Sequence, residues 1–344
     1  MKKKKLLLPI LLLAPAFLAS QVAADEQTAP ETNLEVAAAS TNATDAATPA
    51  STEANTATSE GATESSADLP EANILHTNDV HGRIVEEKGV IGDAKLAAVI
   101  DEERAKNPST LVVDAGDAFQ GLPISNSSKG EERAKILNEI GYDAMAVGNH
   151  EFDFGLDEAK KYKEILNFPL LSSNTYINGA RLFEASTIVD KDKNVVGDEF
   201  VVIGVTTPET ATKTHPKNVQ GVTFTDPISE VNKVVLAHLG VDTTTPIEWR
   251  GSTLAEELSK NSKLKGKRVT VIDGHSHTVQ STTYGDNVTY NQTGSYLNNI
   301  GKITYQANQL LGNPQQISAA STKNVVPNAK VAAMVQKIKE QYDA

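Results

Sequence analysis

From residue 72 onward, short apolar runs alternate with longer stretches in which apolar residues recur at helical spacing. The runs that predict strands are residues 73–76, 110–114, 144–148, 200–205, 233–238 and 269–273. The stretches that predict helices are residues 94–106, 131–140, 156–166 and 254–260. Strands that alternate with helices in this way are typical of an α/β domain whose sheet is largely parallel.

The last part of the chain changes this pattern. Two late apolar runs, residues 287–291 and 301–307, predict paired strands at a sheet edge or in a second sheet. Residues 331–342 predict an amphipathic helix. We therefore expect one domain over residues 71–330 and a terminal helix over residues 331–344.

The N-terminus has the pattern of a secretory signal peptide over residues 1–24. Lysines at positions 2–5 precede an apolar run at 6–19, and small residues at 22–24 supply a cleavage site. An uncleaved membrane anchor is the alternative, but the run is short for a membrane span and contains two prolines. We expect export, with a mature chain that starts near Asp25 and spans no membrane.

Residues 25–70 are rich in Ala, Thr, Ser and Glu and contain no aromatic residue. Such a segment buries too little apolar surface to offset its loss of conformational entropy, which predicts a disordered linker. It would act as a spacer outside the cell, or have no role beyond tolerating proteolysis.

Composition narrows the chemistry. The chain has no cysteine, so a metal site would use His, Asp, Asn, Glu or Gln. The net charge is −12; the four lysines of the signal region and nine acids in residues 25–70 leave −7 for the rest. A mildly acidic domain argues against a nucleic-acid polymer held by its backbone charge, whereas a metal centre could still attract a small phosphorylated substrate. Exported proteins without cysteine are common in Gram-positive bacteria.

Polar motifs follow the predicted strands. Asp79 and His81 follow the first strand, and Asp117 follows the second within a Gly-Asp pair, where Gly116 permits a tight turn. Each motif alone could be a polar turn. The carboxyl ends of strands form the ligand crevice of α/β sheets, so the placement points to a site.

The next motifs are richer in histidine. Asn149 and His150 follow the third strand, and Asp153 lies three residues after His150, a spacing that brings a carboxylate onto an imidazole. A single His238 ends a later strand and, taken alone, fits a satisfied buried histidine. The final motif is a His-x-His sequence formed by His275 and His277.

Together these motifs predict a metal centre. Five of the seven histidines lie just past the ends of predicted strands, among Asp and Asn residues. Such a set of nitrogen and oxygen ligands suits Zn²⁺, Mn²⁺ or a similar divalent ion. Two ions would need a shared carboxylate, and the Gly-Asp motif offers one. We therefore expect a two-metal hydrolase.

The order of these motifs resembles that of the calcineurin-like metallophosphoesterase superfamily. The strings I-L-H-T-N-D-V-H-G-R and G-N-H-E-F-D-F-G resemble the 5′-nucleotidase family in particular, and the resemblance covers about residues 72–344. It implies a four-layer α/β/β/α sandwich, with two sheets face to face and helices outside.

The resemblance also implies a role for each site residue. Asp79, His81 and His277 would hold the first metal, although glutamine also occurs in the family at the position of His277. Asn149, His238 and His275 would hold the second metal. Asp117 would bridge the two ions. His150 and Asp153 would be the catalytic pair, in which His150 stabilises the transferring phosphoryl group or assists the leaving oxygen while Asp153 orients it.

The implied reaction is direct attack of metal-activated hydroxide on a phosphoester, most specifically a 5′-nucleotidase acting on extracellular nucleotides such as AMP. The alternatives are a cyclic-nucleotide (2′,3′) phosphodiesterase, a UDP-sugar hydrolase, a broad phosphomonoesterase, and a surface binding protein that keeps the fold without turnover. The family carries a second, C-terminal domain that grips the nucleoside. Because this sequence stops at Ala344, we expect that domain to be absent, which leaves nucleotide specificity open.

Three residues are left with two interpretations. Arg83 could contact phosphate or be a solvated arginine. His215 fits a loop residue better than a metal ligand, and Trp249 fits packing better than substrate stacking.

Overall fold

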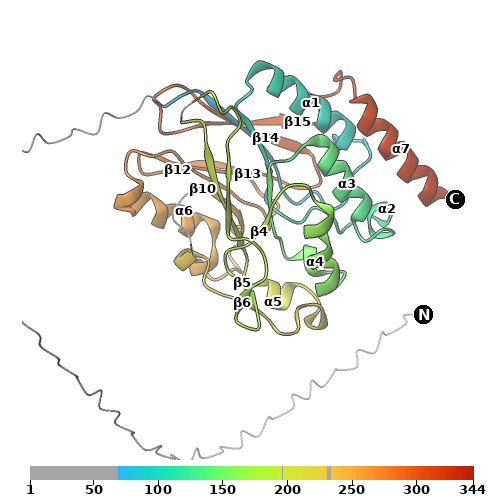
Figure 1. Ribbon diagram of the computed structural model, residues 1–344, viewed down its shortest axis with the longest axis horizontal. Coiled ribbons are helices and arrows are strands. Elements are labelled where there is room, and N and C mark those ends of the chain that lie inside the picture. Colours follow the sequence, from blue (N-terminus) through green and yellow to red (C-terminus); the bar gives the residue numbers. More distant parts are fainter. Residues whose placement is uncertain (1–68, 196, 231–233) are drawn as a thin grey trace, which may run out of the picture. The chain divides into compact units, whose positions relative to one another are not determined.

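The computed structural model describes residues 69–195, 197–230 and 234–344. The predicted signal peptide, and the predicted linker up to residue 68, lie outside the described residues. Two six-stranded sheets form the centre of the described chain (Figure 1). Within these residues, no helix combines the length and the apolar character needed to cross a membrane.

The first sheet has the strand order β15-β14-β1-β2-β3-β4. Strands β1 to β4 run parallel, whereas β14 is antiparallel to β1 and β15 is antiparallel to β14. The bounds are β1 Ala72–Thr77, β2 Thr110–Asp114, β3 Ala144–Ala146, β4 Leu170–Leu171, β14 Asn299–Tyr305 and β15 Asn313–Ser318.

The second sheet has the order β12-β13-β11-β10-β8-β7. Its four inner strands are parallel, and the edge strands β12 and β7 are antiparallel to their neighbours. The bounds are β7 Ser186–Val189, β8 Phe200–Thr206, β10 Val234–His238, β11 Val269–Ile272, β12 Val279–Tyr284 and β13 Val288–Thr293. A small third sheet contains β5 Thr175–Ile177, β6 Ala180–Arg181 and β9 Val222–Phe224.

Helices cover the outer faces of the sheets. The α-helices are α1 Asp93–Lys106, α2 Pro123–Asn126, α3 Glu131–Ile140, α4 Leu156–Ile165, α5 Thr210–Lys213, α6 Gly251–Lys260 and α7 Ala329–Asp343. The described residues also form the short 3-10 helices η1 His150–Phe152, η2 Pro216–Val219, η3 Ile228–Glu230, η4 Ile247–Trp249 and η5 Ser262–Leu264. Helix α3 ends at Gly141, whose left-handed backbone (φ 80°) lets its N–H cap the carbonyl of Leu137.

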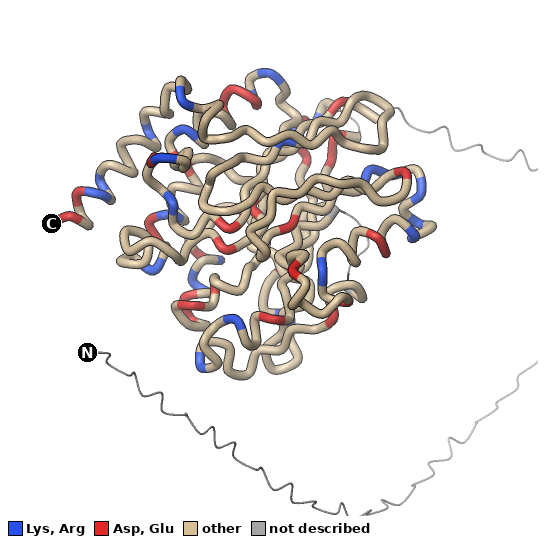
Figure 2. The backbone as a smooth tube through the Cα atoms, turned by 180° about the vertical axis from the view of Figure 1, so that it is seen from behind, with Lys and Arg blue, Asp and Glu red and all other residues tan. Residues whose placement is uncertain are grey.

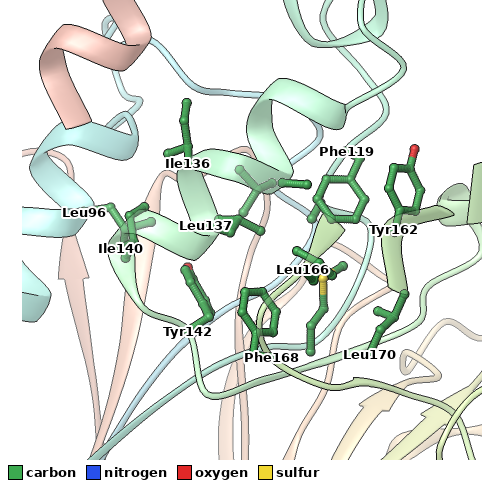
Figure 3. Packing of buried hydrophobic residues seen from close by; sticks show 14 of the residues in the cluster. Leu96, Phe119, Ile136, Leu137, Ile140, Tyr142, Tyr162, Leu166, Phe168 and Leu170 are labelled. Carbon is green, nitrogen blue, oxygen red and sulfur yellow. The ribbon is translucent and has the colours of Figure 1, made fainter. Parts of the chain in front are cut away.

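Successive side chains along each strand point to opposite faces of the sheet, and this alternation separates the apolar cluster between the sheets from the clusters under the helices. Ile74 faces the cluster between the two sheets, whereas its neighbour Leu75 faces the helices outside the first sheet. In the same way, Leu236 faces the cluster between the sheets, and Val235 faces α6 outside the second sheet. Figure 3 shows the outer cluster beneath α3, where large side chains such as Phe119 fill the space above the first sheet. The four-layer α/β/β/α arrangement is thereby confirmed.

One strand prediction is wrong. The two late runs form β13 and β14, but these strands belong to different sheets and do not pair with each other. A turn through Gly294, with φ 85°, separates them, so the chain passes from the second sheet to the first. The hydrophobic pattern predicts that a segment forms a strand, but it does not show which strand lies next to it. The packing of the whole domain decides that.

His76 is the buried histidine of β1. It is 1% exposed, and its Nε2 lies 3.0 Å from Oδ1 of Asn291 on the facing sheet. A Cβ placed on Gly301 would lie 2.1 Å from the same ring nitrogen. The His76 ring therefore fills the space that the side chain of any residue other than glycine would need at position 301. Burial lowers the pKa of His76 from 6.5 to about 3.

We expect this group to make folding sensitive to mild acid. The folded protein resists protonation of His76, so its contribution to stability is complete above pH 6.5 and declines as the pH falls toward 3. Between pH 7.5 and 5.5 this loss is about 1.4 kcal/mol. Urea unfolding of the wild type and His76→Gln should show their stability difference narrowing by that amount at pH 5.5. A difference that is the same at both pH values would contradict this assignment.

Candidate metal centre and catalytic pair

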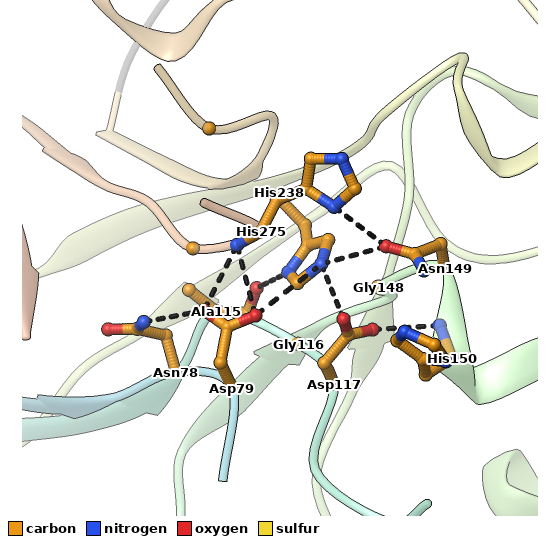
Figure 4. A network of polar contacts seen from close by, with 12 residues as sticks. Asn78, Asp79, Ala115, Gly116, Asp117, Gly148, Asn149, His150, His238 and His275 are labelled. Carbon is orange, nitrogen blue, oxygen red and sulfur yellow. Dashed lines mark hydrogen bonds and ion pairs between the residues drawn. The ribbon is translucent and has the colours of Figure 1, made fainter. Parts of the chain in front are cut away.

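The predicted ligands come together where strands of both sheets end. Asp79 and His81 follow β1, Asp117 follows β2, and Asn149 follows β3 in the first sheet. The second sheet adds the three remaining histidines: His238 at the end of β10, and His275 and His277 after β11. Figure 4 shows side chains from both sheets pointing toward one another at this edge.

The side chains form two groups with metal-ligand spacing. In the first group, ligand atoms of Asp79, His81 and His277 lie within 4.8 Å of one another. In the second group, ligand atoms of Asp117, His238 and His275 meet the same limit. Asn149 joins the second group, because its Oδ1 lies 3.2 Å from Nε2 of His238 and 2.8 Å from Nδ1 of His275.

Most of these residues have an unusual backbone. Asp79, His81, Asp117, His275 and His277 all have positive φ values, between 49° and 73°. Residues other than glycine rarely adopt a backbone conformation with positive φ, and it persists only where surrounding contacts impose it. Here the loops after β1 and β2 are joined by backbone hydrogen bonds, including the N–H of Asp79 to the carbonyl of Gly116 at 2.9 Å. The fold therefore holds five predicted ligands in strained positions.

Gly116 is required by the close approach of these loops. Its φ is 100°, and a Cβ there would lie 2.7 Å from the backbone nitrogen of Gly148 and 2.9 Å from Nδ1 of His238. A larger residue would push apart the strand ends that carry Asp117 and Asn149. The predicted tight turn at this glycine is present in the structure.

Backbone carbonyls orient two of the rings. Nδ1 of His238 lies 2.8 Å from the carbonyl oxygen of Ala115, and Nδ1 of His81 lies 3.1 Å from that of Gln120. A carbonyl only accepts hydrogen bonds, so Nδ1 carries hydrogen in both rings. In each neutral ring this leaves a lone pair on Nε2, the atom that faces the centre.

These lone pairs face other electron-rich atoms. Nε2 of His238 lies 2.9 Å from Oδ2 of Asp117, and Nε2 of His81 lies 3.2 Å from Nε2 of His277. Such pairs repel each other unless a proton or a metal ion lies between them. Carboxylate, imidazole and amide ligands without sulfur suit a divalent cation of the Zn²⁺ or Mn²⁺ kind, so the residues present fit the predicted metals.

The pKa values indicate the same need for a cation. Burial lowers the pKa of His81, His275 and His277, which favours the neutral imidazole that a metal binds. Burial also opposes charge on His238, but the nearby carboxylate of Asp117 raises its pKa to about 10. Asp117 has its pKa depressed by His238 in spite of its burial. Positive charge at this point therefore stabilises the buried carboxylate.

The predicted catalytic pair lies beside the two groups. Nδ1 of His150 is 2.6 Å from Oδ2 of Asp153, and the His150 ring centroid is 5.2 Å from that of His81. The backbone N–H of His150 donates to Oδ1 of Asp117 at 2.8 Å. Burial opposes protonation of His150, but the bond with Asp153 and the charge of Asp117 raise its pKa to about 9. The ring is thus held as a hydrogen-bond donor at the edge of the metal centre.

A sequence model of the calcineurin-like phosphoesterases matches residues 72–279. This chain belongs to the calcineurin-like phosphoesterase family. The match spans every predicted ligand and both members of the His150–Asp153 pair.

Relatives within the family carry the name 5′-nucleotidase. One from Vibrio cholerae is 43% identical over 169 residues, which cover 47% of this chain and 30% of that protein. One from Bos taurus is 36% identical over 225 residues, which cover 60% of this chain and 38% of that protein. The match thus spans roughly a third of the length of these relatives. The predicted resemblance to 5′-nucleotidases is confirmed.

The fold also resembles solved members of the family. A calcineurin-like phosphoesterase from Bacillus subtilis superposes with a TM-score of 0.65 at 23% identity, covering 80% of this chain and 98% of that one. At this level of sequence identity the superposition shows a similar fold, in agreement with the sandwich of two sheets.

Glu151 holds together the backbone of the loops that carry the candidate ligands. It is fully buried, and its carboxylate accepts hydrogen bonds from the backbone N–H groups of Asp117, Ala118 and Gly148 at 2.7–2.9 Å. It thereby joins the loops after β2 and β3. The residue belongs to the Gly-Asn-His-Glu block, but its sequence position did not reveal whether the carboxylate binds metal or backbone.

One aromatic side chain, that of Tyr296, lies beside the first group of candidate ligands. The Tyr296 ring centroid lies 5.6 Å from that of His81 and 5.3 Å from that of His277. The guanidinium of Arg83 lies 4.7 Å from the centre of the same tyrosine ring. Tyr296 was not predicted as part of the site, and a phosphate contact by Arg83 stays a prediction.

The other two open residues lie outside the ligand groups. His215 is exposed, and its Nδ1 accepts a hydrogen bond from the backbone N–H of Lys217 at 3.3 Å. Trp249 ends the short helix η4 and is partly buried. His215 therefore caps the N-terminus of the short helix η2.

Glu209 is a further residue that sequence analysis missed. Its Oε2 lies 3.1 Å from Nε2 of His275 and accepts a hydrogen bond from the hydroxyl of Thr245 at 2.7 Å. A carboxylate only accepts hydrogen bonds, so Nε2 of His275 carries the hydrogen and donates to Glu209, which leaves the lone pair of the neutral ring on Nδ1, the nitrogen that faces Asn149. A carboxylate in this place fixes the ring and makes it a stronger ligand. Nothing near Glu209 in the sequence marks it, since His275 lies 66 positions away.

We expect Glu209→Gln to weaken metal binding at the second group by about ten- to a hundredfold. The amide is similar in size but lacks the negative charge that polarises His275. Competition with a metal-binding dye would measure the affinity of each site. Glu248→Gln, at an exposed position of η4, is the matched control and should retain wild-type affinity. Equal affinities in the two variants would show that Glu209 does not act on the metal ligand.

Proposed function

We propose that this chain is a metal-dependent phosphohydrolase, most specifically a 5′-nucleotidase that releases phosphate from nucleotides outside the cell. The observation that carries the proposal is the placement of two ligand groups, the second of which contains Asp117, beside the His150–Asp153 pair. A phosphoester that contacts both groups would have its phosphorus next to His150. The names of the relatives support a nucleotide as the substrate.

The roles of the ligands follow from their grouping. Asp79, His81 and His277 would hold one divalent ion. Asn149, His238 and His275 would hold the other, and Asp117 would bridge the two. Bound Zn²⁺ or Mn²⁺ would act as a Lewis acid and lower the pKa of water.

The remaining chemistry belongs to the His150–Asp153 pair. Nδ1 of His150 holds its proton against Asp153, which fixes the orientation of the ring. The protonated ring then offers its other N–H to the phosphoryl oxygens or to the departing oxygen. Its charge would offset the negative charge that develops on those oxygens in the transition state.

Phosphate release by the purified chain tests the proposal. The substrates would be AMP, ATP, a 2′,3′-cyclic nucleotide, a UDP-sugar and p-nitrophenyl phosphate, each with added Mn²⁺ or Zn²⁺ and each with chelator. Preference for AMP would support a 5′-nucleotidase. A cyclic nucleotide, a UDP-sugar or the aryl phosphate as the best substrate would indicate the corresponding alternative activity. A folded, metal-loaded protein that releases no phosphate would overturn the proposal in favour of a binding protein.

We also propose that the chain is exported from a bacterial cell. The support is the basic, apolar and small-residue pattern of residues 1–24. Expression of the full chain in a bacterium, followed by N-terminal sequencing of the protein outside the cytoplasm, should give a first residue near Asp25. Retention of Met1 in the cytoplasmic fraction would contradict export.

A further inference from the structure

One short segment of the second half of the domain reaches both parts of the site. Residues 209–218 follow β8 and consist mainly of the single-turn helix α5 and the start of η2. The segment begins with Glu209, which contacts His275 of the second ligand group. It ends beside the His150–Asp153 pair, and we call it the 209–218 segment.

Local interactions give this segment a defined shape. The hydroxyl of Thr210 donates to the carbonyl of Thr207 at 2.6 Å, which fixes the start of α5. Pro216 opens η2, where its restricted φ suits the first helical position. Val219, at the end of η2, is buried in the same apolar cluster as the helices outside the first sheet. The segment is thus anchored at both ends.

Two of its side chains hold Asp153 directly. The hydroxyl of Thr214 donates to Oδ1 of Asp153 at 2.7 Å, while Oδ2 of the same carboxylate faces Nδ1 of His150 at 2.6 Å. The side-chain amide of Asn218 donates to the backbone carbonyl of Asp153 at 2.8 Å. Thr214 is only 6% exposed. Both carboxylate oxygens and the carbonyl of Asp153 therefore have defined partners.

We propose that Thr214 and Asn218 are positioning residues for the His150–Asp153 pair. Through Glu209, the same segment also orients a ligand of the second metal group. The carboxylate of Asp153 can rotate about its side-chain bonds, and one partner on each oxygen stops that rotation. His150 then keeps its Nδ1–H directed at Asp153 and its opposite face directed at the centre.

The chemistry of the contact separates this role from simple packing. A threonine that only filled space could be replaced by valine, which has nearly the same shape, without loss. A threonine that donates to Asp153 could be replaced by serine, which keeps the hydroxyl. Valine and serine at position 214 therefore give opposite results under the two explanations.

The kinetic test compares full-length Thr214→Val, Thr214→Ser and wild type on AMP and p-nitrophenyl phosphate. We expect Thr214→Val to lower kcat about tenfold with KM and bound metal unchanged, and Thr214→Ser to restore most of the rate. Thr223→Val, at an exposed position of β9, is the matched control. Wild-type kcat in Thr214→Val, or an equal loss in both variants at position 214, would overturn the proposal.

A double-mutant cycle tests whether Thr214 acts through Asp153. In an Asp153→Asn background, adding Thr214→Val should cost no further rate, because the carboxylate it positions is gone. The same tenfold loss in both backgrounds would mean that Thr214 acts elsewhere. Asn218→Ala should likewise cost no further rate in the Asp153→Asn background, because its contact with the backbone carbonyl of residue 153 positions the same carboxylate.

The inference rests on the proposed function only for its kinetic arm. Nuclear magnetic resonance of the Nδ1–H of His150 gives a readout that needs no turnover. We expect this proton signal to shift or broaden in Thr214→Val and to return in Thr214→Ser. An unchanged signal in Thr214→Val would overturn the positioning role even if wild type releases no phosphate. Absence of wild-type turnover would instead count against the proposed function alone.

Discussion

Replacing Asp117 by alanine should abolish metal-dependent phosphate release, with a loss of at least about a thousandfold in kcat. Asp117 is buried, with 1% of the residue exposed, and its two oxygens contact different parts of the site. Oδ2 lies 2.9 Å from Nε2 of His238, and Oδ1 accepts the backbone N–H of His150 at 2.8 Å. Alanine removes the shared carboxylate that would bridge the two ions. We therefore also expect metal content to fall at both ligand groups.

Phosphate release and metal content by mass spectrometry would measure these effects together. Asp117→Asn is the companion variant, because it keeps the volume of the side chain but replaces the charged carboxylate by a neutral amide. It should lose most activity as well, since the negative charge is what both ions require. Two tightly bound ions and normal turnover in either folded variant would show that Asp117 does not bridge the metals.

His150→Ala should lower kcat by about a hundred- to ten-thousandfold and leave both metal sites filled. The ring belongs to neither ligand group, so its loss removes a proton donor and a positive charge rather than a ligand. Asp153→Asn should have a smaller effect in the same direction, because the amide can no longer accept the Nδ1–H with a full charge. Turnover, KM and bound metal would be measured for each variant.

Asp157→Asn provides the control for this second experiment. Asp157 lies four residues after Asp153 in the first turn of α4, where its side chain is exposed, and its loss should not alter kcat. An effect of His150→Ala on KM alone would make the histidine a binding group. Loss of metal from His150→Ala would place it among the ligands, and either outcome would contradict the assigned role.

The sequence alone predicted the class of fold, the candidate metal ligands and the candidate catalytic pair. A strand that ends in a polar residue exposes that residue at the sheet edge, and this local rule holds wherever the strand is placed. Asp79, Asp117, Asn149, His238 and His275 could all be named on that basis. The His150–Asp153 contact could be named as well, because three residues in one short helical turn bring the side chains together.

Only the tertiary structure showed how these parts are combined. β13 and β14 look alike as isolated runs, yet they belong to different sheets, because strand partners are selected by packing over the whole domain. Glu209 and Thr214 carry no recognisable motif, and their partners lie 66 and 61 positions away in the chain. The Glu209 contact depends on the order of strands within the second sheet, because Glu209 follows β8 and its partner His275 follows β11. The Thr214 contact depends on how the two sheets face each other, because its partner Asp153 follows β3 of the first sheet. The sequence thus determined which residues sit at strand ends, and strand order and sheet packing decided which side chains orient them.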